Sequence, residues 1–204
     1  LQVLPQLAEL DEAPGYLADA VGDLAAREAQ GVLHKYQGRA LLIASGSCAI
    51  NCRYCFRRHF PYGEEIAAAG QWRQALEHLR QDDSISELIL SGGDPLSLAT
   101  SKLEELGRGL AELPQVIRLR IHSRLPIVLP ERIDSAFLNW FGSLPIQKVM
   151  VLHVNHANEL DASRLAAAPH HFAVPSGPGI ARKRQLQPAR QRVGIINRDL
   201  GART

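Results

Sequence analysis

Three cysteines, Cys48, Cys52 and Cys55, lie within eight positions of one another, and they are the only cysteines in this sequence of 204 residues. Their C-x3-C-x2-C spacing places three thiols on one short loop. Thiolates are soft ligands that suit iron–sulfur clusters or zinc. Three thiolates around a cubane leave one iron open to an exogenous ligand. The spacing therefore predicts a [4Fe–4S] cluster with one open iron.

The cysteines allow two other interpretations. A structural zinc site needs a fourth ligand, for which His59 is the nearby candidate, and zinc ligands usually come as two spaced pairs. Buried structural cysteines are the second alternative, because free cysteine packs well in cores, but Arg53, Arg57 and Arg58 beside the thiols disfavour it. Three thiols so close together do not resemble a secreted disulfide framework, which favours a cytoplasmic location.

Short apolar segments alternate with amphipathic segments along the middle of the chain. The expected strands are 40–45, 87–91, 116–122 and 148–155. The expected helices are 71–80, 101–113 and 134–141. This alternation predicts right-handed βαβ units, a parallel sheet and an α/β fold, either a partial (β/α) barrel or a doubly wound sheet.

Unusual polar sequences follow each expected strand. They occupy residues 48–55, 91–95, 122–124 and 153–156. Ligands bind at the carboxyl ends of strands in both candidate folds. Gly92 and Gly93 would let the backbone approach a ligand closely. Core packing alone would not place all four loops on one side of the sheet, so we expect them to form one site.

Charge divides the chain into parts. Residues 1–163 carry 15 Lys/Arg against 20 Asp/Glu, whereas residues 164–204 carry 8 Lys/Arg against one acidic residue. We expect residues 1–38 to be a lead-in segment with a helix-like stretch at 16–30, and residues 39–163 to be the core. Residues 164–204 form a basic, unpatterned tail that we expect to be disordered or non-native. We therefore expect a barrel truncated after about four β/α units, its C-terminal part missing or frameshifted.

The motifs resemble those of a known superfamily. C-x3-C-x-aromatic-C after the first strand is similar to the signature of the radical S-adenosylmethionine enzymes. Longer stretches resemble the lysine 2,3-aminomutase family, and within it the bacterial branch that makes (R)-β-lysine for elongation factor P. These stretches are LHKY at 33–36, CAINCRYCFRRHFPY at 48–62, SGGDPL at 91–96, RLRIHSRLPIV at 118–128 and VNHANE at 154–159.

The resemblance implies a role for specific residues. The three cysteines would hold the cluster, and Arg57 would pair with the carboxylate of the substrate lysine. The residues implied for S-adenosylmethionine are Tyr54, Ser91, Gly92, Gly93, Asp94, His122 and Ser123. Arg124, His153, Asn155 and His156 face the same rim if the strand prediction holds. Lys35 and Arg39 receive no role.

The implied activity is the conversion of L-lysine to (R)-β-lysine by a radical mechanism. The implied cofactors are the cluster, S-adenosylmethionine and pyridoxal 5′-phosphate, with flavodoxin or ferredoxin as electron donor. Lys183 is the only lysine after Lys148, and its surroundings do not match the family's pyridoxal phosphate lysine, so this chain is expected to be inactive or impaired.

The sequence favours neither a membrane nor a nucleic acid as a partner. No segment approaches the roughly 20 apolar residues of a membrane span. The alternative functions are a zinc-stabilised nucleic-acid-binding module, suggested by the basic tail, and a non-functional fragment. The acidic balance of residues 1–163 and an aromatic content of 5% argue against a nucleic-acid partner.

Overall fold

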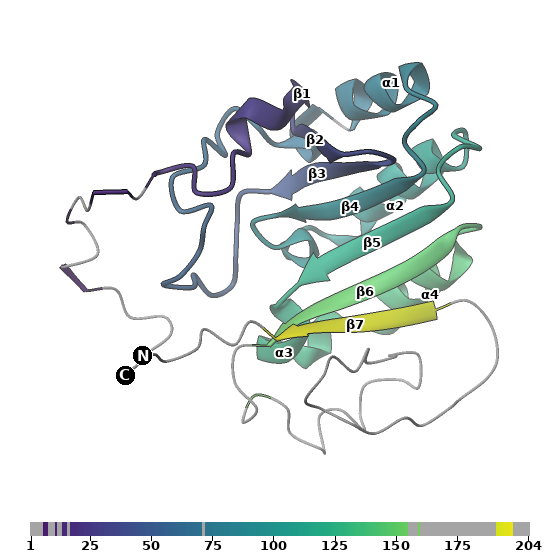
Figure 1. The fold of residues 1–204 in the computed structure, drawn as a ribbon. Coiled ribbons are helices and arrows are strands. Elements are labelled where there is room, and N and C mark those ends of the chain that lie inside the picture. Colours follow the sequence, from purple (N-terminus) through teal and green to yellow (C-terminus); the bar gives the residue numbers. More distant parts are fainter. Residues whose placement is uncertain are drawn as a thin grey trace.

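The computed structural model describes residues 6–7, 11, 14–15, 17–70, 72–154, 159 and the backbone of 191–197. These residues form one seven-stranded sheet in which spatial order follows chain order (Figure 1). The antiparallel strands are β1 (Arg27–Ala29) and β2 (Val32–Tyr36), which precede β3 (Arg39–Ser45). The strands that continue the sheet in parallel from β3 are β4 (Glu87–Gly92), β5 (Arg118–Ser123), β6 (Gln147–Val154) and β7 (Gln191–Asn197).

Helices cover one face of this sheet (Figure 1). They are α1 (Arg73–Gln81), α2 (Thr100–Leu110) and α4 (Ser135–Ser143), with the short α3 (Leu125–Val128) near the end of β5. The 3₁₀ turns are η2 (Leu24–Ala26), η3 (Ala67–Gly70), η4 (Pro95–Ser97) and η5 (Pro130–Arg132). Apolar residues at helical spacing bury one stripe of α2 against the strands, at Leu103, Leu106 and Leu110. The core therefore lies between the helices and the sheet.

The opposite face of the sheet carries charge. Side chains alternate along a strand, so Glu87, Arg118 and Arg120 point away from the core leucines that neighbour them. Glu87 is buried, and its carboxylate accepts from Arg118 Nη1 at 3.2 Å and from Arg120 Nε at 2.7 Å. Arg39 Nε lies 3.6 Å from the same carboxylate. A buried acid is thus surrounded by guanidinium groups from both neighbouring strands.

The predicted α/β fold with a parallel sheet is confirmed. The four expected strands match β3 to β6, and the three expected helices match α1, α2 and α4. The structure adds β7, which lies within the expected tail and pairs in parallel with β6. The remainder of that tail, 164–190 and 198–204, lies outside the described residues.

The helix expected at 16–30 is wrong. Residues 24–26 form only one 3₁₀ turn, and residues 27–29 form β1. Gly22 and Gly31 adopt φ values of 66° and 71°, in the left-handed region that ends a helix and suits a tight turn. The hairpin of β1 and β2 therefore extends the sheet from within residues 1–38, and the three-part division of the chain remains a proposal.

No helix among the described residues has the length and apolar character needed to cross a bilayer.

Candidate functional site

The three cysteines lie on the loop between β3 and η3, beyond the carboxyl ends of the parallel strands (Figure 1). Two turns shape the middle of this cysteine loop, residues 46–66. Cys55 N donates to Cys52 O at 3.1 Å, and Arg58 N donates to Cys55 O at 3.2 Å. Cys48 and Cys55 are exposed, Cys52 is half-buried, and all three are free thiols. Three free sulfur ligands on one loop fit an iron–sulfur cluster.

The pKa of Cys48 reflects its surroundings at the rim. Desolvation by the surrounding loop raises the pKa of Cys48 to about 11, with further contributions from the Asp94 carboxylate and the thiols of Cys55 and Cys52. The other thiols can act on Cys48 only because they lie near it. A bound metal supplies the positive charge that ionises a coordinating thiol. Cys48, with its raised pKa and the other two thiols beside it, therefore suits a metal ligand better than a free nucleophile.

Arg124, which follows β5, reaches the cysteine loop. Its Nη1 donates to Cys52 Sγ at 3.0 Å, and its Nη2 lies 2.8 Å from Glu159 Oε1. A guanidinium forms charge-assisted hydrogen bonds with good directionality. The sequence placed Arg124 on the rim but gave no sign of this contact, because the contact joins residues 72 positions apart.

Gly92 and Gly93 bring the loop after β4 against the start of the cysteine loop. Gly93 N donates to Ser45 O at 2.6 Å. A Cβ added to Gly93 would lie 2.5 Å from Ser47 O, and one added to Gly92, at φ 111°, would lie 2.8 Å from Ser45 O. The sequence predicted that these glycines permit close approach of a ligand. In the described structure they permit close approach of the neighbouring loop, and their contact with a cofactor remains a proposal.

Asp94 joins three strand ends. Its backbone N donates to Ser47 O at 2.8 Å, which ties it to the loop after β3. Its buried carboxylate accepts four hydrogen bonds at 2.6–3.0 Å, from Ser123 Oγ and from the backbone amides of Leu96, Arg124 and Leu125. The side chains of Asp94 and Ser123 are thus both used in hydrogen bonds that fix the positions of the loops at the rim.

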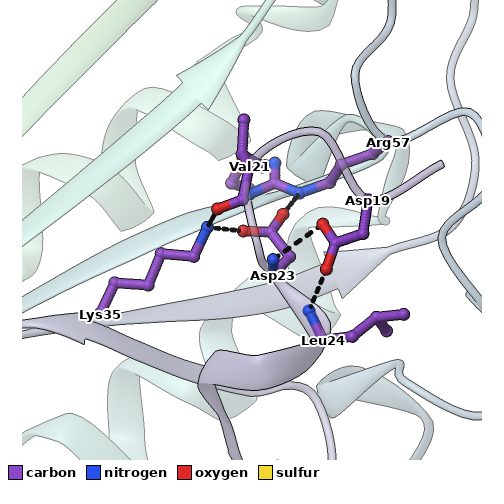
Figure 2. Close-up of polar contacts among 7 residues, drawn as sticks. Asp19, Val21, Asp23, Leu24, Lys35 and Arg57 are labelled. Carbon is purple, nitrogen blue, oxygen red and sulfur yellow. Dashed lines mark hydrogen bonds and ion pairs between the residues drawn. The ribbon is translucent and has the colours of Figure 1, made fainter. Parts of the chain in front are cut away.

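Arg57 is a buried side chain of the cysteine loop, and it helps to tie the loop to the rest of the fold. Figure 2 shows its guanidinium beside Asp23. Arg57 Nε lies 2.6 Å from Asp23 Oδ2. Arg57 Nη1 donates to Ser91 Oγ at the end of β4 at 3.1 Å. Lys35 on β2 forms an ion pair with the other oxygen of Asp23. The loop is therefore anchored to both the hairpin and β4.

Sequence reasoning missed Asp23 and gave Lys35 no role. Asp23 lies in the stretch predicted as a helix, where an acidic residue looks like part of a solvated face. The backbone instead turns there, because Asp19 accepts from the amides of Asp23 and Leu24 at 2.9 Å each (Figure 2). Those amide hydrogen bonds also lower the pKa of Asp19, with the Leu24 amide contributing most.

His122 and Tyr54 lie near other site residues. The ring centroid of His122 lies 5.6 Å from that of His153 in an edge-on arrangement. Burial, aided by His153, Arg120 and Arg57, lowers the pKa of His122 to about 3, so its imidazole is neutral. Burial and a hydrogen bond with Cys52 raise the pKa of Tyr54 to about 12.

The described residues bring most of the predicted site together. Asp94 contacts both the cysteine loop and Ser123, and Arg57 contacts Ser91. Asn155 and His156 lie outside the described residues. The roles of the individual residues toward cofactor and substrate remain proposals.

Comparisons with known proteins agree with this geometry. Residues 37–116 match the family model of a 4Fe-4S single cluster domain. The chain is similar to L-lysine 2,3-aminomutase of Escherichia coli (strain K12), with 46% identity over 160 residues, 78% of this chain and 46% of the relative. The L-lysine 2,3-aminomutase of Haemophilus influenzae is 44% identical over 161 residues, which are 79% of this chain and 48% of the relative. The L-lysine 2,3-aminomutase of Clostridium subterminale is 32% identical over 180 residues, which are 86% of this chain and 43% of the relative.

The fold, the three thiols and the matched domain define an iron–sulfur protein of the radical S-adenosylmethionine class. Over the part that aligns, the chain is similar to several proteins named L-lysine 2,3-aminomutase. It spans about half the length of the curated relatives it matches. The resemblance predicted from the motifs is thus confirmed, and an iron–sulfur domain is favoured over a zinc-stabilised module.

Proposed function

We propose that this chain forms the cluster-binding and S-adenosylmethionine-binding part of an isomerase that converts L-lysine to (R)-β-lysine. The observation that carries the proposal is the placement of three free thiols beside the loop after β4, at the carboxyl ends of a parallel sheet. Ligands of this fold class bind at that rim. The similarity to these aminomutases supplies the substrate class.

Cys48, Cys52 and Cys55 are the proposed cluster ligands. When bound, the cluster and S-adenosylmethionine would supply radical chemistry for hydrogen abstraction. Arg124 holds Cys52 from the side of β5 and keeps that thiol at the rim. The protein's part is to fix the thiols, orient the cofactor through the loop 91–94, His122, Ser123 and Tyr54, and exclude water.

Arg57 is the proposed partner of the lysine carboxylate. Its Nε and Nη1 are used by Asp23 and Ser91, while Nη2 has no hydrogen-bond partner among the described residues. The guanidinium also lies over the Phe56 ring, with Cζ 4.6 Å from the centroid. A guanidinium held in this way loses little conformational freedom on binding an anion. These contacts support a prearranged site for one carboxylate.

Pyridoxal 5′-phosphate, which the resemblance implies, does not fit the described lysines. Lys35 pairs with Asp23, and Lys102 pairs with Glu105. Lys148 donates to the carbonyls of Gly142 and Leu144 at 2.9 Å each. Lys183 lies outside the described residues.

The remaining parts of the proposal concern cellular context. An external one-electron donor, such as flavodoxin or ferredoxin, would reduce the cluster. Three reduced thiols suit the cytoplasm. The proposed use of the product is the modification of elongation factor P, which rests on the similarity of the motifs to that bacterial branch.

Anaerobic reconstitution with iron and sulfide tests the core of the proposal. The parent chain should bind about four irons and, with a reductant, form 5′-deoxyadenosine from S-adenosylmethionine, whereas Cys52→Ala should lose most of both. His59→Gln is the matched control and should behave as the parent. Equal product from Cys52→Ala and the parent would refute the cluster role. Retention of zinc in place of iron, lost in His59→Gln, would support the zinc interpretation instead.

A further inference from the structure

Three side chains able to bind a metal lie at the opposite end of the sheet from the cysteine loop. They are His34 on β2, His78 on α1 and Asp82, which caps the C-terminus of α1. Their ligand atoms all lie within 4.8 Å of one another. Asp82 precedes β4, whereas the cysteine loop follows β3, so the two groups lie at opposite ends of parallel strands. Figure 1 shows β2 and α1 on the same side of the molecule.

The spacing of two of these atoms suits a shared ion. His34 Nδ1 lies 3.6 Å from Asp82 Oδ2, which is longer than a normal hydrogen bond of about 2.7–3.2 Å. Zinc binds nitrogen and carboxylate oxygen at about 2.0–2.2 Å, so two ligands of a tetrahedral ion lie about 3.4 Å apart. Ser84 N donates to Asp82 Oδ1 at 2.9 Å, which leaves Oδ2 to face His34.

His78 supplies an independent observation. Its Nε2 is buried and has no hydrogen-bond partner among the described residues. Such an atom is costly to bury unless something binds it. His78 and Asp82 are one helical turn apart and so lie on one face of α1. The side chains of His34 and Asp82 are 19% and 29% exposed, so solvent can provide a further ligand.

We propose that His34, His78 and Asp82 form a second metal site that binds a divalent transition ion, with Zn²⁺ as its representative. Two imidazoles and one carboxylate are a ligand set that such ions prefer, and a water molecule completes the coordination. The site is separate from the cysteine loop and does not depend on the proposed function. A bound ion would join the β1–β2 hairpin to α1.

Zinc-edge X-ray absorption on the cluster-loaded full chain tests the site directly, because the absorption edge of iron lies at a lower energy and the fine structure at the zinc edge reports on zinc. After addition of one equivalent of Zn²⁺, the first shell should contain nitrogen and oxygen at about 2.0–2.2 Å and no sulfur at about 2.3 Å. A sulfur shell would place the zinc on the cysteines and overturn the proposal. Failure of the chain to retain one equivalent would do the same.

Matched variants test which residues bind. Asp82→Asn and His34→Gln should each weaken Zn²⁺ binding at least tenfold and should reduce the rise in melting temperature that Zn²⁺ causes. Asp83→Asn removes the same charge at the exposed neighbouring position and should bind as the parent does. Equal losses in Asp82→Asn and Asp83→Asn would overturn the proposal. Circular dichroism of each variant without zinc separates lost binding from lost folding.

Discussion

The loops after β3 and β4 lie side by side but are built differently. The cysteine loop presents exposed thiols and is tied to the fold through Ser45, Ser47, Arg57 and Cys52. The loop after β4 is short and buried, and its polar groups are used by neighbouring strand ends. The cysteine loop therefore provides the thiol ligands, whereas the loop after β4 fixes their position. Changes to anchoring residues should therefore damage the cysteine loop although they remove no thiol.

The anchor at Asp23 should give the largest effect on stability. Asp23→Ala removes the carboxylate shared by Arg57 and Lys35 and leaves a buried guanidinium without its counterion. We expect the free energy of unfolding to fall by about 4 kcal/mol, measured by urea denaturation. Asp19→Ala, in the same turn, removes an acid that caps backbone amides and should cost less. Equal losses would indicate that the turn, and not the ion pair, anchors the loop.

The second prediction concerns the contact between the two loops. Gly93→Ala places a methyl group 2.5 Å from Ser47 O, so the backbone must shift. We expect a loss of about 3 kcal/mol in unfolding free energy, together with reduced iron incorporation. Gly63→Ala lies in the cysteine loop with nothing within 4 Å and should leave both measurements unchanged. Normal iron binding by Gly93→Ala would show that the cysteine loop folds independently of its neighbour.

Asp94→Asn should have a smaller effect than either. The amide keeps one oxygen acceptor but presents a donor to groups that themselves donate, such as Arg124 N and Leu125 N. We expect a loss of about 2 kcal/mol by urea denaturation. Asp134→Asn is the matched control, because asparagine caps a helix N-terminus as well as aspartate does. Identical stability of Asp94→Asn and the parent would contradict the positioning role.

The smallest expected effect is a dependence on pH. The pKa of His122 falls to about 3 on folding, from 6.5, mainly through burial. The unfolded chain therefore binds the extra proton first, and stability falls as pH drops from about 6.5 toward 3. Between pH 6.5 and 5 we expect a loss of about 1.6 kcal/mol in the parent that is absent in His122→Gln. Parallel curves for the two proteins would assign the pH dependence to other groups.

The regular part of the fold could be predicted from the sequence because its elements are long and periodic. The apolar runs of β3 to β6 and the stripe of α2 carry clear patterns. The strands β1 and β2 are three and five residues long, which is too short for an alternating pattern to be recognised. The small residues before them have a composition typical of a helix. The strand β7 includes the apolar residues Val193, Ile195 and Ile196, but this short run lies within a basic segment that shows no sustained period, and it pairs with β6.

The thiol ligands of the site could be predicted from the sequence, but the residues that anchor their loop could not. The spacing of Cys48, Cys52 and Cys55 is local and chemically specific. The contacts of Asp23 with Arg57 and of Arg124 with Cys52 join residues 34 and 72 positions apart, and a single charged residue carries no sign of such a partner. The loop glycines were found, but their close contact with Ser45 and Ser47 requires the folded arrangement.

The buried Glu87 has a consequence for how the strands align. It pairs with Arg118 directly across from β4 to β5, and its carboxylate also binds Arg120. If β5 slipped by one residue, Leu119 would face this acid and the guanidinium groups would turn to the apolar side. A buried carboxylate without a cation is strongly disfavoured. Glu87 therefore discriminates against the shifted alignments that plain leucine-rich strands would tolerate.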